Sequence, residues 1–187
     1  MGCSTREGNR PEGGIFVRIA VTGTPGTGKT TVTEELETDL SVIHLNDVIQ
    51  AEKLTQGYDE KRESALADIN AIAEYLEGRE NVIFESHLAH QFDSDQVIVL
   101  RCHPTELESR LTKRGEPAAK ARENAESEAL DVILAEAVTR HGEDHVYEID
   151  TTDRSIDAVV DDVRAVLDGV REPAAGTVSF IDYLEER

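Results

Sequence analysis

The 187-residue sequence contains no tryptophan, one methionine, two cysteines and only 4% aromatic residues. The two cysteines, Cys3 and Cys102, are too few for a disulfide-stapled fold and favour a reducing, cytoplasmic setting. No apolar stretch is long enough for a membrane span or for the apolar region of a signal sequence. The chain begins Met-Gly-Cys, but Arg6 stands where a myristoylation signal has serine or threonine. We therefore expect neither a disulfide nor a membrane anchor.

Basic residues are also scarce, since 19 lysines and arginines face 39 acidic residues and the net charge is −20. Nucleic acids and anionic membranes bind to basic surfaces, so this composition argues against both as partners. Such a charge destabilises a compact state by self-repulsion unless salt screens it, which suggests adaptation to a salty, halophilic cytoplasm. An ordinary acidic enzyme, or one that docks on a basic protein, remains an alternative.

The most informative stretch is Ile19–Thr31, which reads Ile-Ala-Val-Thr-Gly-Thr-Pro-Gly-Thr-Gly-Lys-Thr-Thr. It contains the complete pattern G-x-x-x-x-G-K-[ST], follows an apolar run and precedes an amphipathic one, which is the context of a phosphate-binding loop (P-loop). Glycines let the backbone curl around an oxyanion at the start of a helix. Lys29 supplies positive charge to the β- and γ-phosphates, and the Thr30 hydroxyl can ligate Mg²⁺. Thr31 is placed to bind the α-phosphate.

Apolar strand-like runs alternate with helical periodicity along the rest of the chain. We expect strands at 15–21, 41–45, 81–87, 96–102 and 144–150, and helices at 29–40, 46–53, 61–76, 104–114, 118–140 and 155–170. This alternation predicts an α/β fold, with one parallel five-stranded sheet covered by helices on both faces. The domain spans 15–170, between a disordered leader (1–14) and a C-terminal tail (171–187). Residues 57–59 are expected to form a loop, and 55–62 and 114–118 to be mobile flaps.

A second group of chemical residues follows the expected strand 81–87. Glu85 comes directly after Val-Ile-Phe, and parallel sheets bind ligands at the carboxyl ends of their strands. A carboxylate at that edge can support a magnesium ion, so we predict that Glu85 belongs to the site. His87 lies two residues further and points the same way if the strand continues.

Three arginines stand out in this acidic chain, namely Arg101, Arg110 and Arg114. Arg110 and Arg114 are spaced i, i+4 and share one helix face. Arginines stabilise the charge that develops in phosphoryl transfer, often from a closing lid. Lys120 follows just after the Gly-Glu-Pro break as a further candidate. The alternative for these residues is salt bridging with neighbouring glutamates.

Several short motifs stand in an order that resembles one known family. They are Gly-Thr-Pro-Gly-Thr-Gly-Lys-Thr-Thr at 23–31, Gly-Tyr-Asp-Glu at 57–60, Glu-Ser-His at 85–87, Val-Leu-Arg at 99–101, Arg-Leu-x-x-Arg-Gly at 110–115 and Glu-Asn-x-Glu-x-Glu at 123–128. The set resembles the adenylate kinase isoenzyme 6 family of archaea and eukaryotic nuclei, over about residues 15–170.

This resemblance implies a P-loop kinase fold with a segment that binds a nucleoside monophosphate (NMP), at about 44–67 and including Asp47, and a lid at about 113–123. It implies ATP- and Mg²⁺-dependent phosphorylation of AMP or another NMP, ATPase activity, and a role in small-ribosomal-subunit maturation through a basic ribosomal protein. By position, the implied ATP contacts are Gly26, Thr27, Gly28, Lys29, Thr30, Thr31 and Arg114. The implied catalytic residues are Lys29, Arg110, Arg114 and Glu85, and the magnesium residues are Thr30 and Glu85.

Three departures from the family pattern qualify the resemblance. Glu85-Ser86-His87 replaces the usual Asp-x-His, and the longer carboxylate alters the metal geometry. Glu116-Pro117 stands where an aromatic residue usually follows the lid Arg-Gly, so that residue cannot stack on adenine. A basic residue of the last loop is absent around Asp153, although Arg154 is adjacent.

The residues leave several functions open. One alternative to an NMP kinase is an ATPase switch that binds and releases a basic ribosomal protein. Another is a small-metabolite kinase of the shikimate or gluconate type, whose acceptor pocket would differ. A GTPase is disfavoured, because the guanine motif Asn-Lys-x-Asp does not occur.

Overall fold

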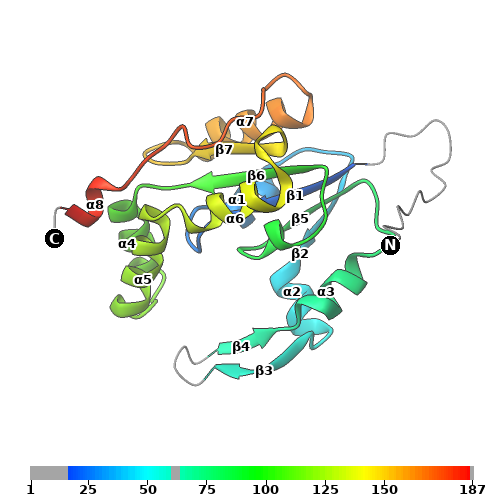
Figure 1. Cartoon of the computed structure of the whole chain (residues 1–187), viewed down its shortest axis with the longest axis horizontal. Coiled ribbons are helices and arrows are strands. Elements are labelled where there is room, and N and C mark those ends of the chain that lie inside the picture. The colour runs from blue at the N-terminus through cyan, green and yellow to red at the C-terminus, as the bar shows by residue number, and fades with distance from the viewer. Residues whose placement is uncertain (1–16, 60–63, 186–187) are drawn as a thin grey trace, which may run out of the picture.

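The computed structural model describes residues 17–59 and 64–185, so the expected leader lies outside the described residues. Five parallel strands form the main sheet in the spatial order β2-β5-β1-β6-β7 (Figure 1). These strands are β1 (Arg18–Thr22), β2 (Ser41–His44), β5 (Val82–Glu85), β6 (Gln96–Arg101) and β7 (Val146–Asp150). Each overlaps an expected strand, and the expected parallel five-stranded sheet is confirmed.

Helices cover both faces of this sheet (Figure 1). The described helices are α1 (Lys29–Glu35), α2 (Leu45–Ala51), α3 (Ile69–Leu76), α4 (Pro104–Lys113), α5 (Ala118–Ala129), α6 (Val132–His141), α7 (Ile156–Leu167) and α8 (Asp182–Glu185), with 3-10 turns η1 (Ala89–Gln91) and η2 (Glu143–His145). Side chains alternate between the faces of a strand. Accordingly, Ile19 and Val21 of β1 pack with α1 and α7, whereas Ala20 packs with α3 and α6. Among the described helices, none combines the length and apolarity needed to cross a bilayer.

The centre of the sheet determines where the site lies. β1 is the middle strand, with β5 on one side and β6 on the other, so the strand order reverses around it. In open parallel sheets, ligands bind beyond the carboxyl ends of the strands at such a point. The loop after β1 is the P-loop, and it lies at that position.

The segment after α2 differs from the expected loop and long helix. Thr55–Asp59 forms β3 and pairs antiparallel with β4 (Ser64–Ala67). The expected helix from residue 61 instead begins at Ile69, because the Asp68 carboxylate accepts a hydrogen bond from the Ala71 amide at 3.1 Å and caps the helix there. The expected loop at 57–59 and the first turns of the helix were therefore wrong where the structure describes them, and residues 60–63 lie outside it.

The expected long helix at 118–140 is two helices, α5 and α6. Between them Asp131 has left-handed backbone, with φ 55°, which aspartate tolerates better than most residues. The Arg101 guanidinium donates to the Glu128 carbonyl at 3.1 Å and also pairs with the Asp131 carboxylate. Arg101 of β6 thus donates to a carbonyl of the last turn of α5, and α5 ends there. Likewise α1 ends at Glu35 rather than 40, where buried Leu36 adopts extended backbone.

The described part of the C-terminal segment packs against the domain. Ala174 forms a parallel bridge with Tyr147 of β7. Phe180 and Tyr183 are buried against Ala125 and Ala129 of α5. Figure 1 shows α8 beside α4, and α8 also contacts α5. The described part of the expected C-terminal tail therefore packs on the domain.

Candidate functional site

The P-loop has the backbone conformation that its glycines permit. Gly23, Gly26 and Gly28 have φ of 139°, 95° and 97°. A Cβ on Gly23 would lie 2.3 Å from the Leu100 carbonyl oxygen of β6, so only glycine fits there. The loop leads directly into α1, whose amino end favours anions. This cradle suits a phosphate group.

Lys29 is buried beneath the loop, with a relative exposure of 7%. Its Nζ donates to the carbonyl oxygens of Gly23 and Thr24, at 2.8 and 3.0 Å. Desolvation lowers the pKa of Lys29 to about 8, partly opposed by the carboxylates of Glu85 and Glu128. The nearby positive charge of Arg114 lowers this pKa further. The Lys29 ammonium therefore lies inside the loop, where it donates to two carbonyl oxygens that the oxygens of a bound phosphate can replace.

Glu85 lies at the carboxyl end of β5 and is only 2% exposed. Its Oε1 accepts from the Thr30 hydroxyl at 3.1 Å and lies 2.9 Å from Nδ1 of His44. Its Oε2 is buried and has no hydrogen-bond partner in the part of the chain that the structure describes. Buried carboxylate oxygens are normally paired in folded proteins, so this atom is available to bind a ligand. Carboxylate and hydroxyl oxygens are what Mg²⁺ prefers, and the ion usually takes few protein ligands and keeps several waters, so Thr30 and Glu85 fit it.

His44 is a site residue that the sequence analysis did not identify. It ends β2, directly opposite Glu85 in the parallel pairing of β2 with β5. The available signal was that two neighbouring strands both end in a polar residue at the ligand-binding edge of the sheet.

His87 is not an extension of β5, because the strand ends at Glu85. Its side chain is exposed. Although part of the residue is exposed, the surrounding protein partly desolvates the imidazole, and this together with the charges of Lys29, His90 and Lys120 lowers the pKa of His87 below its ordinary value. The structure therefore places Lys29 and Lys120 near this imidazole, although the strand alternation used to orient it does not apply.

Arg110 and Arg114 differ in their surroundings. The Arg110 guanidinium is half-buried, pairs with Glu106 at 2.5 Å, and donates to the carbonyl oxygens of Gly26 and Thr151 at 3.4 and 3.1 Å. It therefore supports the P-loop backbone and also makes the salt bridge expected as the alternative. Arg114 ends α4 and is exposed, yet its charge reaches Lys29. Lys120 pairs with Glu116 at 3.1 Å.

The remaining predicted residues surround this centre. The Thr27 side chain is fully buried, and its hydroxyl donates to the Thr24 carbonyl at 2.9 Å, so only its backbone can face a phosphate. Thr30 and Thr31 are exposed in the first turn of α1. Asp47 is exposed in the first turn of α2.

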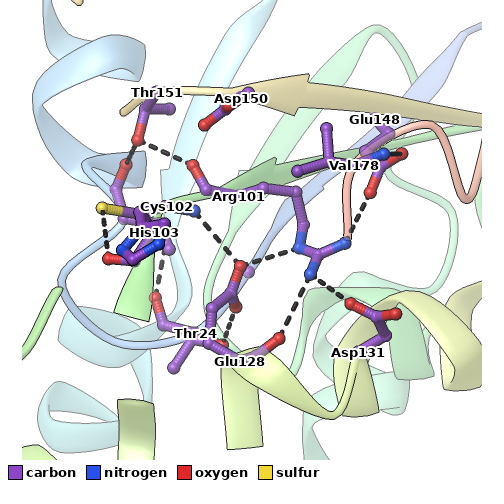
Figure 2. Close-up of polar contacts among 12 residues, drawn as sticks. Thr24, Arg101, Cys102, His103, Glu128, Asp131, Glu148, Asp150, Thr151 and Val178 are labelled. Carbon is purple, nitrogen blue, oxygen red and sulfur yellow. Dashed lines mark hydrogen bonds and ion pairs between the residues drawn. The ribbon is translucent and has the colours of Figure 1, made fainter. Parts of the chain in front are cut away.

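Arg101 does not belong with the other two arginines. Its side chain is 1% exposed and is surrounded by three carboxylates, those of Glu128, Asp131 and Glu148 (Figure 2). The Arg101 Cζ atom lies over the Phe180 ring, 5.4 Å from the ring centroid. The grouping of Arg101 with a basic site cluster was therefore wrong, because its charge is fully engaged inside the domain.

Comparisons with known proteins agree with this geometry. Residues 19–131 match a family model described as an AAA domain. The chain is 58% identical to a protein of Natronomonas pharaonis named “Putative adenylate kinase”, across 90% of this chain and 100% of that one. Proteins with the same name from Halobacterium salinarum and Methanosarcina acetivorans are 57% and 42% identical, across 90% and 88% of this chain and 100% and 97% of theirs.

Solved structures with low identity show the same fold. Shikimate kinase from Bacteroides thetaiotaomicron matches with a TM-score of 0.55 at 17% identity, covering 82% of this chain and 99% of that one. Deoxyadenosine kinase from M. mycoides also matches with a TM-score of 0.55, at 20% identity, covering 82% of this chain and 100% of that one. The architecture is that of P-loop kinases.

Proposed function

The chain belongs to the archaeal family whose members carry the name “Putative adenylate kinase”, and from this premise we propose that it transfers the γ-phosphoryl group of ATP to a nucleoside monophosphate, with AMP as the first choice. The observation that carries the proposal is that a buried P-loop lysine, Lys29, occurs together with the hydrogen-bonded residues Thr30 and Glu85. The Glu85 Oε2 atom has no partner among the described residues. A P-loop cradles the phosphates of a nucleotide, and this pair provides the oxygens that its magnesium ion needs.

The proposed reaction requires no nucleophile from the protein. A phosphate oxygen of the NMP attacks the γ-phosphorus, and the bond from that phosphorus to the bridging oxygen of ADP breaks. Lys29 leaves the carbonyl oxygens of Gly23 and Thr24 and binds the β- and γ-phosphates. Thr30 and Glu85 would hold Mg²⁺, which would neutralise phosphate charge when bound. His44 fixes the Glu85 carboxylate in position through their 2.9 Å contact.

Positive charge on the lid completes the proposed mechanism. Arg114 is exposed at the end of α4, next to the Gly115 turn, from where it can reach the transferring phosphoryl group. Closure of the lid, about residues 113–123, excludes water, and the positive charge of Lys120 is close enough to lower the pKa of His87. Arg110 contributes by holding the Gly26 carbonyl. The NMP is proposed to bind over residues 44–67, where Asp47 is available to its sugar or base.

A coupled assay of ADP formation from ATP and AMP, in low and molar KCl, tests this function. We expect AMP-dependent turnover that Lys29→Ala abolishes, with Arg164→Ala, an exposed arginine of α7, as a matched control. Shikimate and gluconate as acceptors test the small-metabolite alternative. ADP formation that is independent of AMP would contradict the kinase proposal.

A second proposal follows from the net charge of −20. An acidic surface favours a basic partner, and a basic small-subunit ribosomal protein would make the chain a ribosome-assembly ATPase. In that case water is the acceptor, and slow ATP hydrolysis accelerates when the partner is added. A basic protein that neither binds nor changes hydrolysis would argue against this role.

A further inference from the structure

Glu128 is a buried carboxylate of α5 that touches the P-loop. It lies in the last turn of the helix and is 3% exposed. Its Oε2 accepts from the Thr24 hydroxyl at 2.5 Å, and its Oε1 accepts from Arg101 Nε at 2.7 Å and from the Cys102 amide at 3.2 Å (Figure 2). One carboxylate therefore joins the helix that follows the lid break, the end of β6 and the P-loop.

Thr24 is the residue through which this contact reaches the nucleotide site. Its side chain is held by Glu128, and its carbonyl oxygen accepts from Lys29 Nζ at 3.0 Å and from the Thr27 hydroxyl and amide at 2.9 and 3.2 Å. The position of Thr24 thus fixes the first turn of the loop and the resting place of Lys29. Hydrogen bonds with a charged partner are about twice as strong as neutral ones.

Neutralising Arg101 does not explain why Glu128 reaches Thr24. The guanidinium already pairs with Asp131 and Glu148 on its other nitrogens. Glu128 uses only one oxygen on Arg101 and gives the other to the loop. Its negative charge also favours the protonated form of Lys29.

We propose that Glu128 is a positioning residue for nucleotide binding, which holds the P-loop in its phosphate-binding conformation through Thr24 from the end of α5. The inference rests on the proposed function only in taking ATP as the ligand. It is tested by ATP affinity, whereas the kinase proposal is tested by transfer to AMP, so either can fail alone.

The test begins with Thr24→Val, which keeps the shape of the side chain and removes the hydroxyl. We expect the Kd for ATP, measured by calorimetry in molar KCl, to rise about tenfold or more, as expected from loss of a hydrogen bond to a charged group. Thr24→Ser retains the hydroxyl and should restore most of the affinity. Lys29→Ala defines the signal without specific binding.

A matched variant separates loop positioning from general damage to the buried cluster. Asp131→Asn weakens one ion pair of Arg101, does not touch the P-loop, and keeps a residue that tolerates left-handed backbone. It should lower the thermal midpoint and leave the Kd for ATP within about twofold, a difference of less than about 0.5 kcal/mol.

Glu128→Gln completes a double-mutant cycle with Thr24→Val. Its amide can donate to the Thr24 hydroxyl while its oxygen keeps Arg101 and Cys102, so we expect a milder loss of affinity. Adding Thr24→Val in this background should cost less than it costs in the native chain. The proposal is overturned if Thr24→Val binds ATP as tightly as the native protein, or if Asp131→Asn weakens ATP binding as much as Thr24→Val does. It is also overturned if the effects of Thr24→Val and Glu128→Gln on the Kd are independent of each other.

Discussion

Replacing Arg101 by methionine is the sharpest test of how this fold is held together. The substitution keeps an unbranched apolar stem and removes the guanidinium that pairs with the carboxylates of Glu128, Asp131 and Glu148. Glu128 and Glu148 are 3% and 2% exposed, so water cannot replace the lost partner. Glu148 also accepts from the Thr177 amide and hydroxyl at 2.7 and 2.8 Å, which anchors the C-terminal segment.

The magnitude follows from the burial of the carboxylates. Breaking a buried ion pair by removing one partner costs about 3–5 kcal/mol, because a charge is left uncompensated. In a chain of this size each 1 kcal/mol shifts the thermal midpoint by about 2–4 °C, so we expect a fall of about 6–20 °C. Native domains have only about 5–15 kcal/mol of total stability, so the variant loses a large share of it.

Circular dichroism during thermal and urea unfolding in molar KCl measures this loss. The matched control is Arg164→Met, because Arg164 is 41% exposed and pairs with the exposed Asp161. Exposed pairs contribute about 0–1 kcal/mol, so the control should unfold near the native midpoint. Equal midpoints for Arg101→Met and Arg164→Met would refute the reasoning.

Four further predictions concern the site, the C-terminal segment and salt. The Kd for ATP should rise as the pH passes above about 8, because Lys29 loses its proton there in the free protein; a flat Kd between pH 7 and 9 would contradict this. Glu85→Gln should lower AMP-dependent turnover at least about a hundredfold, since the metal loses an anionic ligand; unchanged turnover would place the ion elsewhere. Phe180→Ala should lower the free energy of unfolding by about 3 kcal/mol, with exposed Val170→Ala as its control. The unfolding midpoint should increase with KCl concentration, because salt screens the repulsion within a chain of charge −20; equal midpoints in low and molar KCl would argue for an ordinary acidic protein.

The sheet and the P-loop could be predicted because their signals are local. Apolar runs such as 96–102 specify buried parallel strands, and the glycine spacing of 23–28 specifies a loop. The place of Glu85 at the carboxyl edge followed from the same strand pattern and from the rules of parallel sheets.

Two of the features that were missed depend on partners far apart in the sequence. The break between α5 and α6 depends on Arg101, which is 30 residues from Asp131. The pairing of His44 with Glu85 needs the register of β2 and β5. The β3–β4 hairpin was missed for a local reason, because 64–76 reads as one helical period until the Asp68 cap is recognised.

The most direct test of the proposed function follows the γ-phosphoryl group itself. The native protein is incubated in molar KCl with AMP and with ATP that carries a radiolabelled γ-phosphate, and the products are separated by chromatography. The account predicts that the label appears in ADP, and that Lys29→Ala forms none. Label that appears only in inorganic phosphate would contradict it, because water and not AMP would then be the acceptor.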